Sequence, residues 1–383
     1  MKIKPLSKCS LGNKKVLLRA DMNVPISGGK VTNKERIIRS LPTIKFILEK
    51  SSKLIVLSHL GRPIENNIIQ EEFSLQPVAR SLEEELGRPV KLIRNIDEAI
   101  NSNEEILILE NIRFFKGEKN NDLNLSKQLA SLADIFVMDA FATSHRSHAS
   151  TVGVTDFIDE ACSGLLIQEE MKALDKIIDA RSPVLAVLGG GKISSKLSLI
   201  NSLSEKADHL ILGGGIANTC WGSLGKEIGN SLTEISMYKE ARLLSTIENV
   251  LIPDKVIVAK NLDSTPKEKG IDFVEKDDSI YDISPNFFNS IETLFNEAAT
   301  IIWNGPMGLF EANNFSFGTR ALASLVASSD AYSVIGGGDT ISAASEAGIL
   351  DSIDYVSTAG GAFLEYIEGK SLPALEALKN KNI

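Results

Sequence analysis

The feature that most limits the fold of this chain is a series of short, β-branched apolar runs separated by stretches of helical periodicity. Each run is long enough for one strand but too short for a typical helix. Such runs, spaced by helices, are typical of parallel sheets covered on both faces. They are KKVLLRA, KLIVLSH, ILILE and DIFVMDA before residue 165, and PVLAVL, DHLILGG, KVIVA, TIIW and AYSVIGG after it. The sequence therefore predicts an α/β fold.

The distribution of charge favours two separate sheets over one closed barrel. Residues 1–165 have a net charge of +2 and carry nine of the twelve arginines, whereas residues 166–383 have a net charge of −11. We predict two doubly wound, Rossmann-like parallel-sheet domains, residues 1–165 and 166–365, joined by a helix within residues 164–180 and with a cleft between them. Residues 366–383 are expected to pack back on the first domain.

Composition excludes several classes of protein. No apolar run reaches the roughly 18 residues of a membrane helix, and the first residues lack the apolar core of a signal peptide. The net charge of −9 argues against nucleic acid as a main partner. Three cysteines without a CxxC pattern favour a reducing compartment. We therefore expect a cytoplasmic protein without a membrane or nucleic-acid partner. Since no amphipathic surface stripe stands out, we expect a monomer.

Charged residues follow the predicted strands of the first domain, where ligands of open parallel sheets bind. A single surface arginine is usually a solvated charge, but arginines after all four strands indicate a site for a strongly anionic molecule. The residues at these strand ends are Arg19, Asp21, Asn23, His59, Arg62, Arg113, His145 and Arg146.

Glycines follow the strands of the second domain instead, at 189–191, 213–215, 336–338 and 360–361. The segment GGGKISSKL matches neither the Walker A loop nor the dinucleotide fingerprint. A helix is nevertheless expected to begin near Ile193, which would place Lys192 and Lys196 one turn apart with an anion between them. The alternative is a tight structural turn followed by two solvated lysines.

The segment GGGDT offers a place for a metal ion. Backbone N–H groups at a helix start can hold phosphates while the Asp339 carboxylate binds Mg²⁺, a cation that prefers oxygen ligands. Asp339 could equally be an ordinary helix N-cap. An arginine-lined site and a glycine-rich site together suggest phosphoryl transfer between two bound molecules.

The sequence contains no obvious general base. His59, His145 and His148 lie near arginine-bearing strand ends, where they are expected to bind anions. A base is unnecessary if the acceptor is a carboxylate, which is already ionised at neutral pH. Catalysis would then depend on positioning, on charge neutralisation by Arg, Lys and Mg²⁺, and on domain closure that excludes water.

The chain resembles the phosphoglycerate kinase family along essentially its whole length. The motifs, in family order, are RADMNVP, SHLGRP, ENIRF, DAFATSHRSHAS, GGGKISSKL, GGGIANT, WNGPMGLFE and GGGDT. The resemblance implies a reversible, Mg²⁺-dependent reaction in which 1,3-bisphosphoglycerate and ADP give 3-phosphoglycerate and ATP, the first ATP-forming step of glycolysis.

The resemblance also implies which residues form the sites. The triose site would comprise Asp21, Asn23, Arg36, His59, Arg62, Arg113 and Arg146. The nucleotide site would comprise Lys196, Asn304, Glu311, Gly337, Gly338, Asp339 and Thr340. Arg36 and Lys192 would contact the transferring phosphoryl group, with Lys196 and Gly338 completing the catalytic set. Glu311 would hold the ribose hydroxyls, and Asp339 the metal ion.

The sequence departs from the family pattern at three positions. Ala142 and Ser144 replace the usual Gly and Ala of one motif, and Ala359 replaces a glycine in another. Alanine would cost about 1 kcal/mol or more if positive φ were required there. Two other hypotheses remain at this point: a nicotinamide dehydrogenase, disfavoured because GxGxxG is missing, and a catalytically silent anion-binding module.

Overall fold

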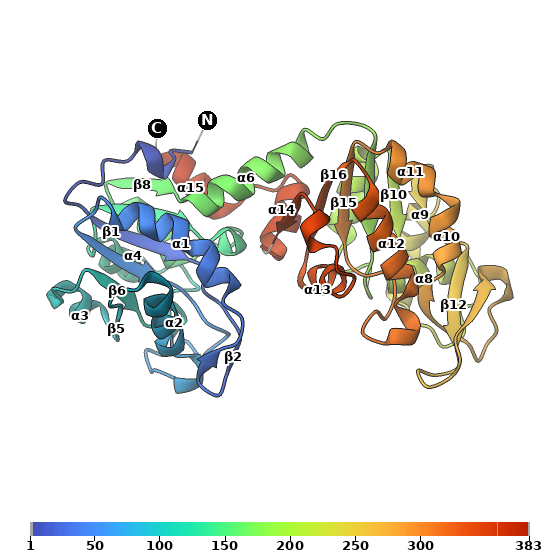
Figure 1. Ribbon diagram of the computed structural model, residues 1–383, viewed down its shortest axis with the longest axis horizontal. Helices are drawn as coiled ribbons and strands as arrows, with labels where there is room; N and C mark the ends of the chain where they lie inside the picture. The colour runs from blue at the N-terminus through green and yellow to red at the C-terminus, as the bar shows by residue number, and fades with distance from the viewer. Residues whose placement is uncertain (1–2, 358, 382–383) are drawn as a thin grey trace. The chain divides into compact units, whose positions relative to one another are not determined.

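The computed structural model describes residues 3–357 and 359–381, and the chain divides into two compact units. Unit 1 comprises Met1–Lys172 and Ser371–Ile383, and unit 2 comprises Ala173–Lys370. Each unit contains one six-stranded parallel sheet (Figure 1). The predicted α/β class with two parallel-sheet domains is confirmed. Among the described residues, no helix combines the length and the apolar character needed to cross a membrane.

The sheet of unit 1 has the strand order β5-β6-β4-β1-β7-β8, and every neighbouring pair is parallel. Its strands are β1 (Lys15–Ala20), β4 (Lys53–Leu57), β5 (Lys91–Ile93), β6 (Ile106–Leu109), β7 (Ile135–Asp139) and β8 (Glu160–Ser163). The helices are α1 (Glu35–Leu48), α2 (Gln76–Leu86), α3 (Ile96–Asn101), α4 (Leu123–Ala130) and α5 (Val154–Phe157), and β2 (Ile26–Ser27) pairs with β3 (Lys30–Val31) in a hairpin. The four strands predicted from the sequence are the central ones, and the edge strands β5 and β8 were not predicted.

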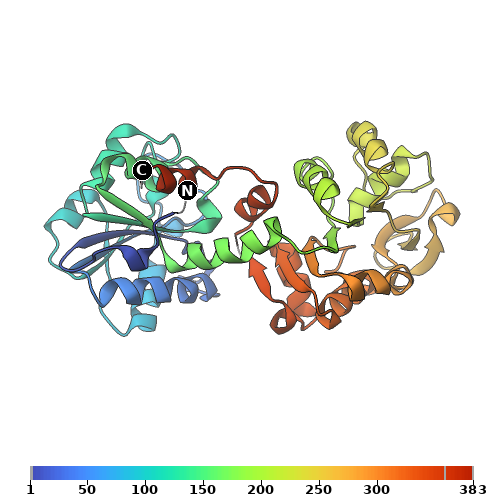
Figure 2. The same cartoon turned by 90° about the horizontal axis from the view of Figure 1, so that it is seen from above.

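Successive side chains of β1 point to opposite faces of the sheet, and they are buried on both faces. Val16 and Leu18 belong to a core cluster with Ile37 and Ile44 of α1. Leu17 points to the opposite face and is also fully buried. Helices lie on both faces of the sheet in the view of Figure 2. The continuous apolar runs therefore reflect burial on two sides.

The main sheet of unit 2 has the order β11-β10-β9-β15-β16-β17 and is likewise parallel. Its strands are β9 (Val184–Leu188), β10 (His209–Leu212), β11 (Val250–Leu251), β15 (Thr300–Asn304), β16 (Tyr332–Gly336) and β17 (Tyr355–Ser357). The helices are α7 (Leu197–Lys206), α8 (Gly214–Ser223), α9 (Tyr238–Leu244), α10 (Pro285–Ser290), α11 (Glu292–Glu297), α12 (Phe317–Ser328), α13 (Gly338–Glu346) and α14 (Gly361–Ile367).

One predicted parallel strand belongs to a different sheet. The run KVIVA forms β12 (Lys255–Ala259), which pairs antiparallel with β13 (Lys267–Gly270) and β14 (Ser279–Ile283). Its assignment to a parallel sheet was wrong. Both faces of β12 are buried, by the main core on one side and by Phe315 on the other, so its sequence looks like that of a parallel strand.

The chain passes from unit 1 to unit 2 through α6 (Leu165–Ile178), within the segment predicted to be helical. It returns at residue 371, and α15 (Pro373–Lys381) belongs to unit 1. There α15 packs against β8 and α5, burying Ala374, Leu375 and Leu378. The Ala374 N–H also donates to the Ser144 carbonyl oxygen at 3.1 Å.

Candidate active site

The carboxyl ends of four neighbouring strands bring the predicted charged residues of unit 1 to one edge of the sheet. Strands β6, β4, β1 and β7 are adjacent and parallel, so their ends coincide. The structure places Asp21 and Asn23 after β1, His59 and Arg62 after β4, Arg113 in a 3-10 turn after β6, and Arg146 after β7. The strand-end interpretation thus identifies a real spatial cluster.

Arg36 joins this cluster from the first turn of α1. Its Nη1 donates to Asp21 Oδ2 at 2.7 Å, and the Asp21 carboxylate is 7% exposed. The other Asp21 oxygen accepts from the Asn23 backbone N–H at 3.3 Å, and Asn23 Oδ1 accepts from the Gly61 N–H at 2.9 Å. Strand ends alone could not reveal Arg36, because it lies in a helix and reaches the site through its long side chain.

Two further arginines are held in place by neighbouring groups. Arg113 is nearly buried and its Nη1 donates to the Gly61 carbonyl oxygen. Arg146 Nε lies 3.1 Å from His145 Nε2, which accepts its hydrogen bond. Burial, and then the nearby Arg62, lower the pKa of Arg146, and Asp21 opposes this. These cations therefore repel one another, and an anionic ligand would relieve that repulsion.

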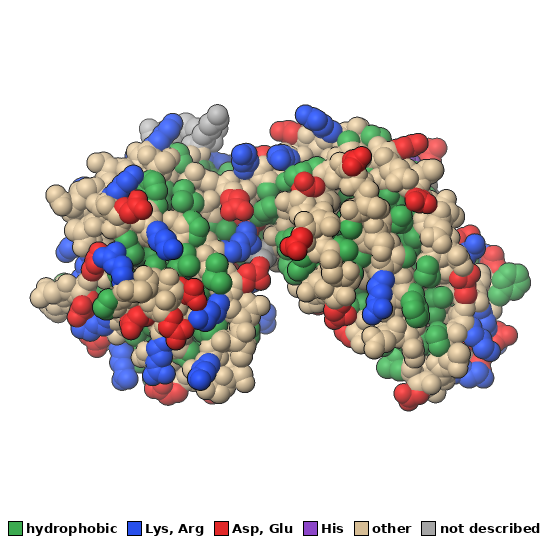
Figure 3. Space-filling model, in the orientation of Figure 1, with side chains coloured by type: hydrophobic (Ala, Val, Ile, Leu, Met, Phe, Trp, Pro, Cys, Tyr) green, Lys and Arg blue, Asp and Glu red, His purple; other side chains and the backbone are tan. Residues whose placement is uncertain are grey.

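The arginine cluster does not simply reflect a basic surface. On the face of unit 1 drawn in Figure 3, Lys and Arg side chains are interspersed with Asp and Glu. The cluster instead follows from the strand order, which gathers arginines from segments more than 80 residues apart, such as those around Arg62 and Arg146.

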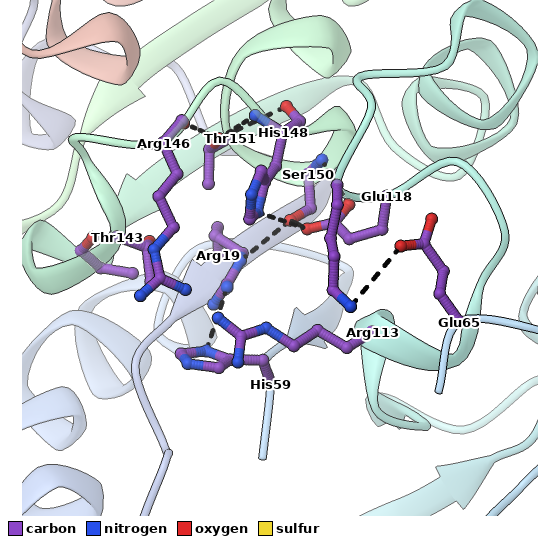
Figure 4. Close-up of polar contacts among 12 residues, drawn as sticks. Arg19, His59, Glu65, Arg113, Glu118, Thr143, Arg146, His148, Ser150 and Thr151 are labelled. Carbon is purple, nitrogen blue, oxygen red and sulfur yellow. Dashed lines mark hydrogen bonds and ion pairs between the residues drawn. The ribbon is translucent and has the colours of Figure 1, made fainter. Parts of the chain in front are cut away.

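His59 is almost completely buried next to Arg19 (Figure 4), with 4% of its surface exposed. Burial, followed by the charge of Arg19, lowers its pKa well below the ordinary value. The ring is therefore neutral at pH 7 and offers one N–H and one lone pair. His145 and His148 are half-buried nearby, and His148 Nδ1 lies 3.6 Å from Glu118 Oε1.

In unit 2, glycine-rich loops follow the adjacent strands β10, β9, β15 and β16. They border a cavity of about 530 Å³. Its polar lining includes Gly190, Gly191, Gly214, Gly215, Glu311 and Asp339. Ile280, Tyr281, Met307 and Leu309 form an apolar wall that the sequence analysis missed. An apolar wall beside exposed backbone suits a ligand with both a flat apolar part and charged groups.

Glycine is required where two of these loops touch. A Cβ at Gly215 would lie 2.3 Å from the Gly191 carbonyl oxygen, and Gly214 has a φ of +63°. No side chain fits between the loops, so their backbones lie in direct contact beside the cavity. This geometry suits close approach to phosphate oxygens.

The expected helix start near Ile193 was wrong. Residues 193–196 form turns, and α7 begins at Leu197 with Lys196 as its N-cap. The backbone N–H and Oγ of Ser194 donate to the Glu234 carboxylate at 3.0 and 2.6 Å, which holds the segment outside the helix. Lys192 and Lys196 therefore do not share one helical face.

Lys196 instead folds back against the strand ends. Its Nζ donates to the carbonyl oxygens of Gly189 and Asn304, at 2.7 and 3.0 Å. Burial lowers the pKa of Lys196 to about 8, and the carboxylate of Asp339 partly offsets this. Lys192 is exposed. The two lysines thus occupy different environments, one anchored and one free to move.

Asn304 and Thr340 organise the loop after β16. Asn304 Nδ2 donates to the Gly336 carbonyl oxygen at 2.5 Å, whereas its buried Oδ1 has no hydrogen-bond partner among the described residues. Thr340 Oγ1 donates to the same carbonyl at 2.8 Å and accepts from the Gly305 N–H at 2.7 Å. The free oxygen of Asn304 is available to a donor on a ligand, while the Thr340 hydroxyl is already used.

Gly337, Gly338 and Asp339 present the start of α13. Gly337 has a φ of +95°, and α13 begins at Gly338, one residue before Asp339. Asp339 and Glu311 are exposed carboxylates at the cavity. In the described chain, non-glycine residues with positive φ are confined to Asn13, Asn67 and Asn121. The alanines at 142 and 359 are therefore not strained in this way.

The comparisons with known proteins decide the family. The family model described as phosphoglycerate kinase matches residues 6–370. The chain belongs to the phosphoglycerate kinase family. It is 47% identical to a phosphoglycerate kinase of Francisella philomiragia over 98% of both chains. The solved phosphoglycerate kinase structure from Coxiella burnetii aligns with a TM-score of 0.92 at 45% identity, over 99% of both chains. The solved phosphoglycerate kinase structure from Pyrococcus horikoshii aligns with a TM-score of 0.83 at 29% identity, over 99% of both chains.

Family membership confirms the resemblance stated from the motifs. The chain is a nucleotide-binding kinase that transfers a phosphoryl group between 1,3-bisphosphoglycerate and ADP in glycolysis. The nicotinamide dehydrogenase hypothesis is thereby excluded.

Proposed function

We propose that unit 1 binds the triose through Asp21, Asn23, Arg36, His59, Arg62, Arg113 and Arg146. The observation that carries this proposal is their convergence at the ends of β6, β4, β1 and β7. Within the cluster, the Asp21 carboxylate is paired with Arg36 and so leaves an excess of positive charge. That excess suits 3-phosphoglycerate and 1,3-bisphosphoglycerate, which carry several negative charges.

We propose that unit 2 binds ATP or ADP in the glycine-lined cavity. The apolar wall suits the base, and Glu311 is available to the ribose hydroxyls. Lys196, Asn304 and the segment Gly337–Thr340 would hold the phosphates, with Lys192 reaching the transferring group. Because the Thr340 hydroxyl is occupied, its contribution would come from its backbone N–H at the start of α13.

Asp339 is the residue proposed to hold Mg²⁺. Its exposed carboxylate lines the nucleotide cavity, and carboxylate oxygen is a ligand that Mg²⁺ prefers. When bound, the ion would neutralise the charge that develops on the phosphate oxygens. Lys196 and the free Asn304 oxygen lie at the neighbouring strand ends and would orient the same phosphates.

We propose that the reaction needs no general base. In the reverse direction the attacking group is the carboxylate of 3-phosphoglycerate, which carries no proton at neutral pH. Arg36, Lys192, Lys196 and Gly338 would act by positioning and by stabilising charge. Since the two substrates are assigned to different units, a relative movement of the units would bring them together and exclude water.

We further propose that the protein acts as a cytoplasmic monomer, without a nucleic-acid or membrane partner. Cys9, Cys162 and Cys220 are free thiols, as expected in a reducing compartment. All residues assigned to both substrates come from one chain.

A coupled assay tests this function. ATP, Mg²⁺ and 3-phosphoglycerate are supplied, and glyceraldehyde-3-phosphate dehydrogenase consumes NADH as product forms. We expect NADH loss that requires both substrates and stops with EDTA. Asp339→Asn should raise the Mg²⁺ requirement by about tenfold or more while 3-phosphoglycerate binding stays unchanged. Binding of both ligands without turnover would support the silent-module hypothesis instead.

A further inference from the structure

A buried polar chain lies behind the triose cluster and ends at His59 (Figure 4). It runs from Glu118 through Ser150 and Arg19 to His59, which come from four separate segments of unit 1. Glu118 is fully buried, and Arg19 is 1% exposed. Burying a charged pair costs free energy unless its hydrogen bonds are satisfied. Stability alone therefore does not explain why these four side chains are linked in the interior.

Arg19 meets His59 at one ring nitrogen. Arg19 Nη2 lies 3.3 Å from His59 Nδ1. Because a guanidinium has only donors, Nδ1 must be the acceptor in this contact. A neutral imidazole whose Nδ1 accepts carries its proton on Nε2. The protonation of the ring thus follows from the identity of its neighbour.

Arg19 cannot rotate away from this contact without losing its other partners. Its Nε donates to Ser150 Oγ at 3.1 Å, and its Nη1 donates to the Ala20 carbonyl oxygen at 2.5 Å. Ser150 is in turn fixed by Glu118, which accepts from the Ser150 hydroxyl at 2.6 Å and from its backbone N–H at 3.0 Å. The orientation of Ser150 is therefore set, with its oxygen lone pair directed to Arg19.

Glu118 also balances the charge of Arg19. The Glu118 carboxylate raises the pKa of Arg19, which burial alone would lower. Without that carboxylate, the buried guanidinium would keep only the weaker influence of Asp21 against the repulsion of Arg146. Glu118 thus stabilises the charge of Arg19, to which it is linked by two hydrogen bonds through Ser150.

We propose that Arg19 is a positioning residue that holds His59 as the neutral tautomer protonated at Nε2, with Ser150 and Glu118 fixing Arg19. This inference rests on the proposed triose site. It assigns His59 a single role, because Nε2–H can only donate, to an oxygen of the anionic triose. With the other tautomer, a lone pair would face that oxygen and repel it.

The surroundings of His59 also disfavour a doubly protonated ring. The pKa of His59 is lowered by the charges of four neighbours, which are Arg19, Arg36, Arg146 and His148. In the imidazolium, an Nδ1–H would also point at the donors of Arg19. The ring should consequently stay neutral as the pH falls well below the usual pKa of histidine.

Nitrogen NMR of the wild-type protein, labelled with ¹⁵N-histidine, tests the tautomer, and a variant is needed only to assign the signal. The His59 signal is assigned by its loss in His59→Gln. We expect a lone pair at Nδ1 and a proton at Nε2, unchanged from about pH 8 to about pH 5.5. A proton at Nδ1, or a doubly protonated ring at about pH 7, would overturn the proposal.

Variants test the consequence for binding. Arg19→Met removes the donors, and we expect a mixture of His59 tautomers and a KM for 3-phosphoglycerate raised about tenfold or more, with the KM for ATP within about twofold. Arg19→Lys should restore part of the binding. Arg80→Met, at an exposed position on α2, is the matched control. It should change neither the His59 tautomer nor the KM for 3-phosphoglycerate. A pure Nε2–H tautomer retained in folded Arg19→Met would contradict the role given to Arg19.

A second pair of variants covers the case in which Arg19→Met does not fold. The amide nitrogen of Gln can replace Nε2–H, whereas that of Asn lies nearer to Nδ1. His59→Gln should therefore bind 3-phosphoglycerate about tenfold more tightly than His59→Asn. Equal affinities would count against the proposal. If His59 is protonated at Nε2 but the protein shows no kinase turnover, the proposed function would be wrong and the inference about the tautomer would stand.

Discussion

Arg36 shows what a single side chain contributes to the triose cluster. Its guanidinium is paired with Asp21 at 2.7 Å and keeps 31% of its side-chain surface exposed, so a ligand can reach it from solvent. If it stabilises charge on the transferring group, Arg36→Ala should lower kcat by about 10²–10³-fold. ATP affinity should stay within about twofold, because Arg36 belongs to unit 1 whereas the residues proposed to bind the nucleotide belong to unit 2. Steady-state kinetics and calorimetry measure the two effects.

Two controls make the Arg36 result interpretable. Lys45→Ala, at an exposed position on the same helix, should leave kcat unchanged. Thermal unfolding followed by circular dichroism shows whether losing the partner of Asp21 destabilises the fold. A normal kcat in a folded Arg36→Ala protein would overturn the assigned role.

Lys196 should make nucleotide binding depend on pH. Burial lowers its pKa from 10.5 to about 8 in the free protein. Bound phosphates would raise that pKa again, since they stabilise the ammonium. Between about pH 8 and about pH 10 the free protein releases the Lys196 proton, so ADP affinity should fall by up to about tenfold per pH unit. Calorimetry between these pH values measures the ADP affinity. Lys196→Met should bind ADP weakly, and its affinity should no longer depend on pH in this range.

The lowered pKa of Lys196 should also make the free energy of unfolding depend on pH. In the window between the folded pKa of about 8 and the unfolded value of 10.5, the unfolded chain binds more protons at Lys196 than the folded one. Stability from this group therefore rises with pH across the window, and the penalty for burying the ammonium is fully present below about pH 8. Lys196→Met should remove that rise in denaturant titrations.

At the scale of elements, the loops of unit 2 meet through their backbones. A Cβ at Gly215 would lie 2.3 Å from the Gly191 carbonyl oxygen. Gly215→Ala should therefore lower the free energy of unfolding by about 1–3 kcal/mol and weaken ADP binding, because the loop after β9 must shift. Gly12→Ala is the control, since a Cβ there meets nothing within 4 Å. Urea titration and calorimetry measure both effects. An unchanged ADP affinity in Gly215→Ala would show that this loop does not bind phosphate.

Which elements the sequence predicts depends on where their determinants lie. The central strands were predicted because burial on both faces leaves a continuous apolar run. The edge strands β5 and β11 have three and two residues, too few for a pattern. The start of α7 was misplaced because Glu234, forty residues away, binds Ser194 and delays the helix. Tertiary hydrogen bonds of this kind leave no local trace in the sequence.

The site was predictable to the extent that topology alone assembles it. Parallel strands bring their carboxyl ends together, so His59 and Arg113 could be grouped without a structure. Arg36 came only from the family motifs. The anchoring of Lys196 at two carbonyls and the free oxygen of Asn304 depend on rotamers, which spacing along the chain does not determine.

At the scale of the whole molecule, the uneven distribution of charge should separate the two substrates by their response to salt. Residues 1–165 are net positive and residues 166–383 strongly negative. The triose would be held largely by arginines, including the exposed Arg62, and screening weakens such attraction. From about 50 mM to about 500 mM KCl, the KM for 3-phosphoglycerate should rise several-fold.

The nucleotide should respond less, because backbone N–H groups and the apolar wall that includes Tyr281 are not screened by ions. We expect the KM for Mg²⁺-ATP to change by less than about twofold over the same range. Arg62→Gln should reduce the slope for 3-phosphoglycerate alone, since it removes the exposed member of the cluster. Equal slopes for both substrates would mean that salt acts on a step common to them, such as movement of the units, and not on the arginine cluster.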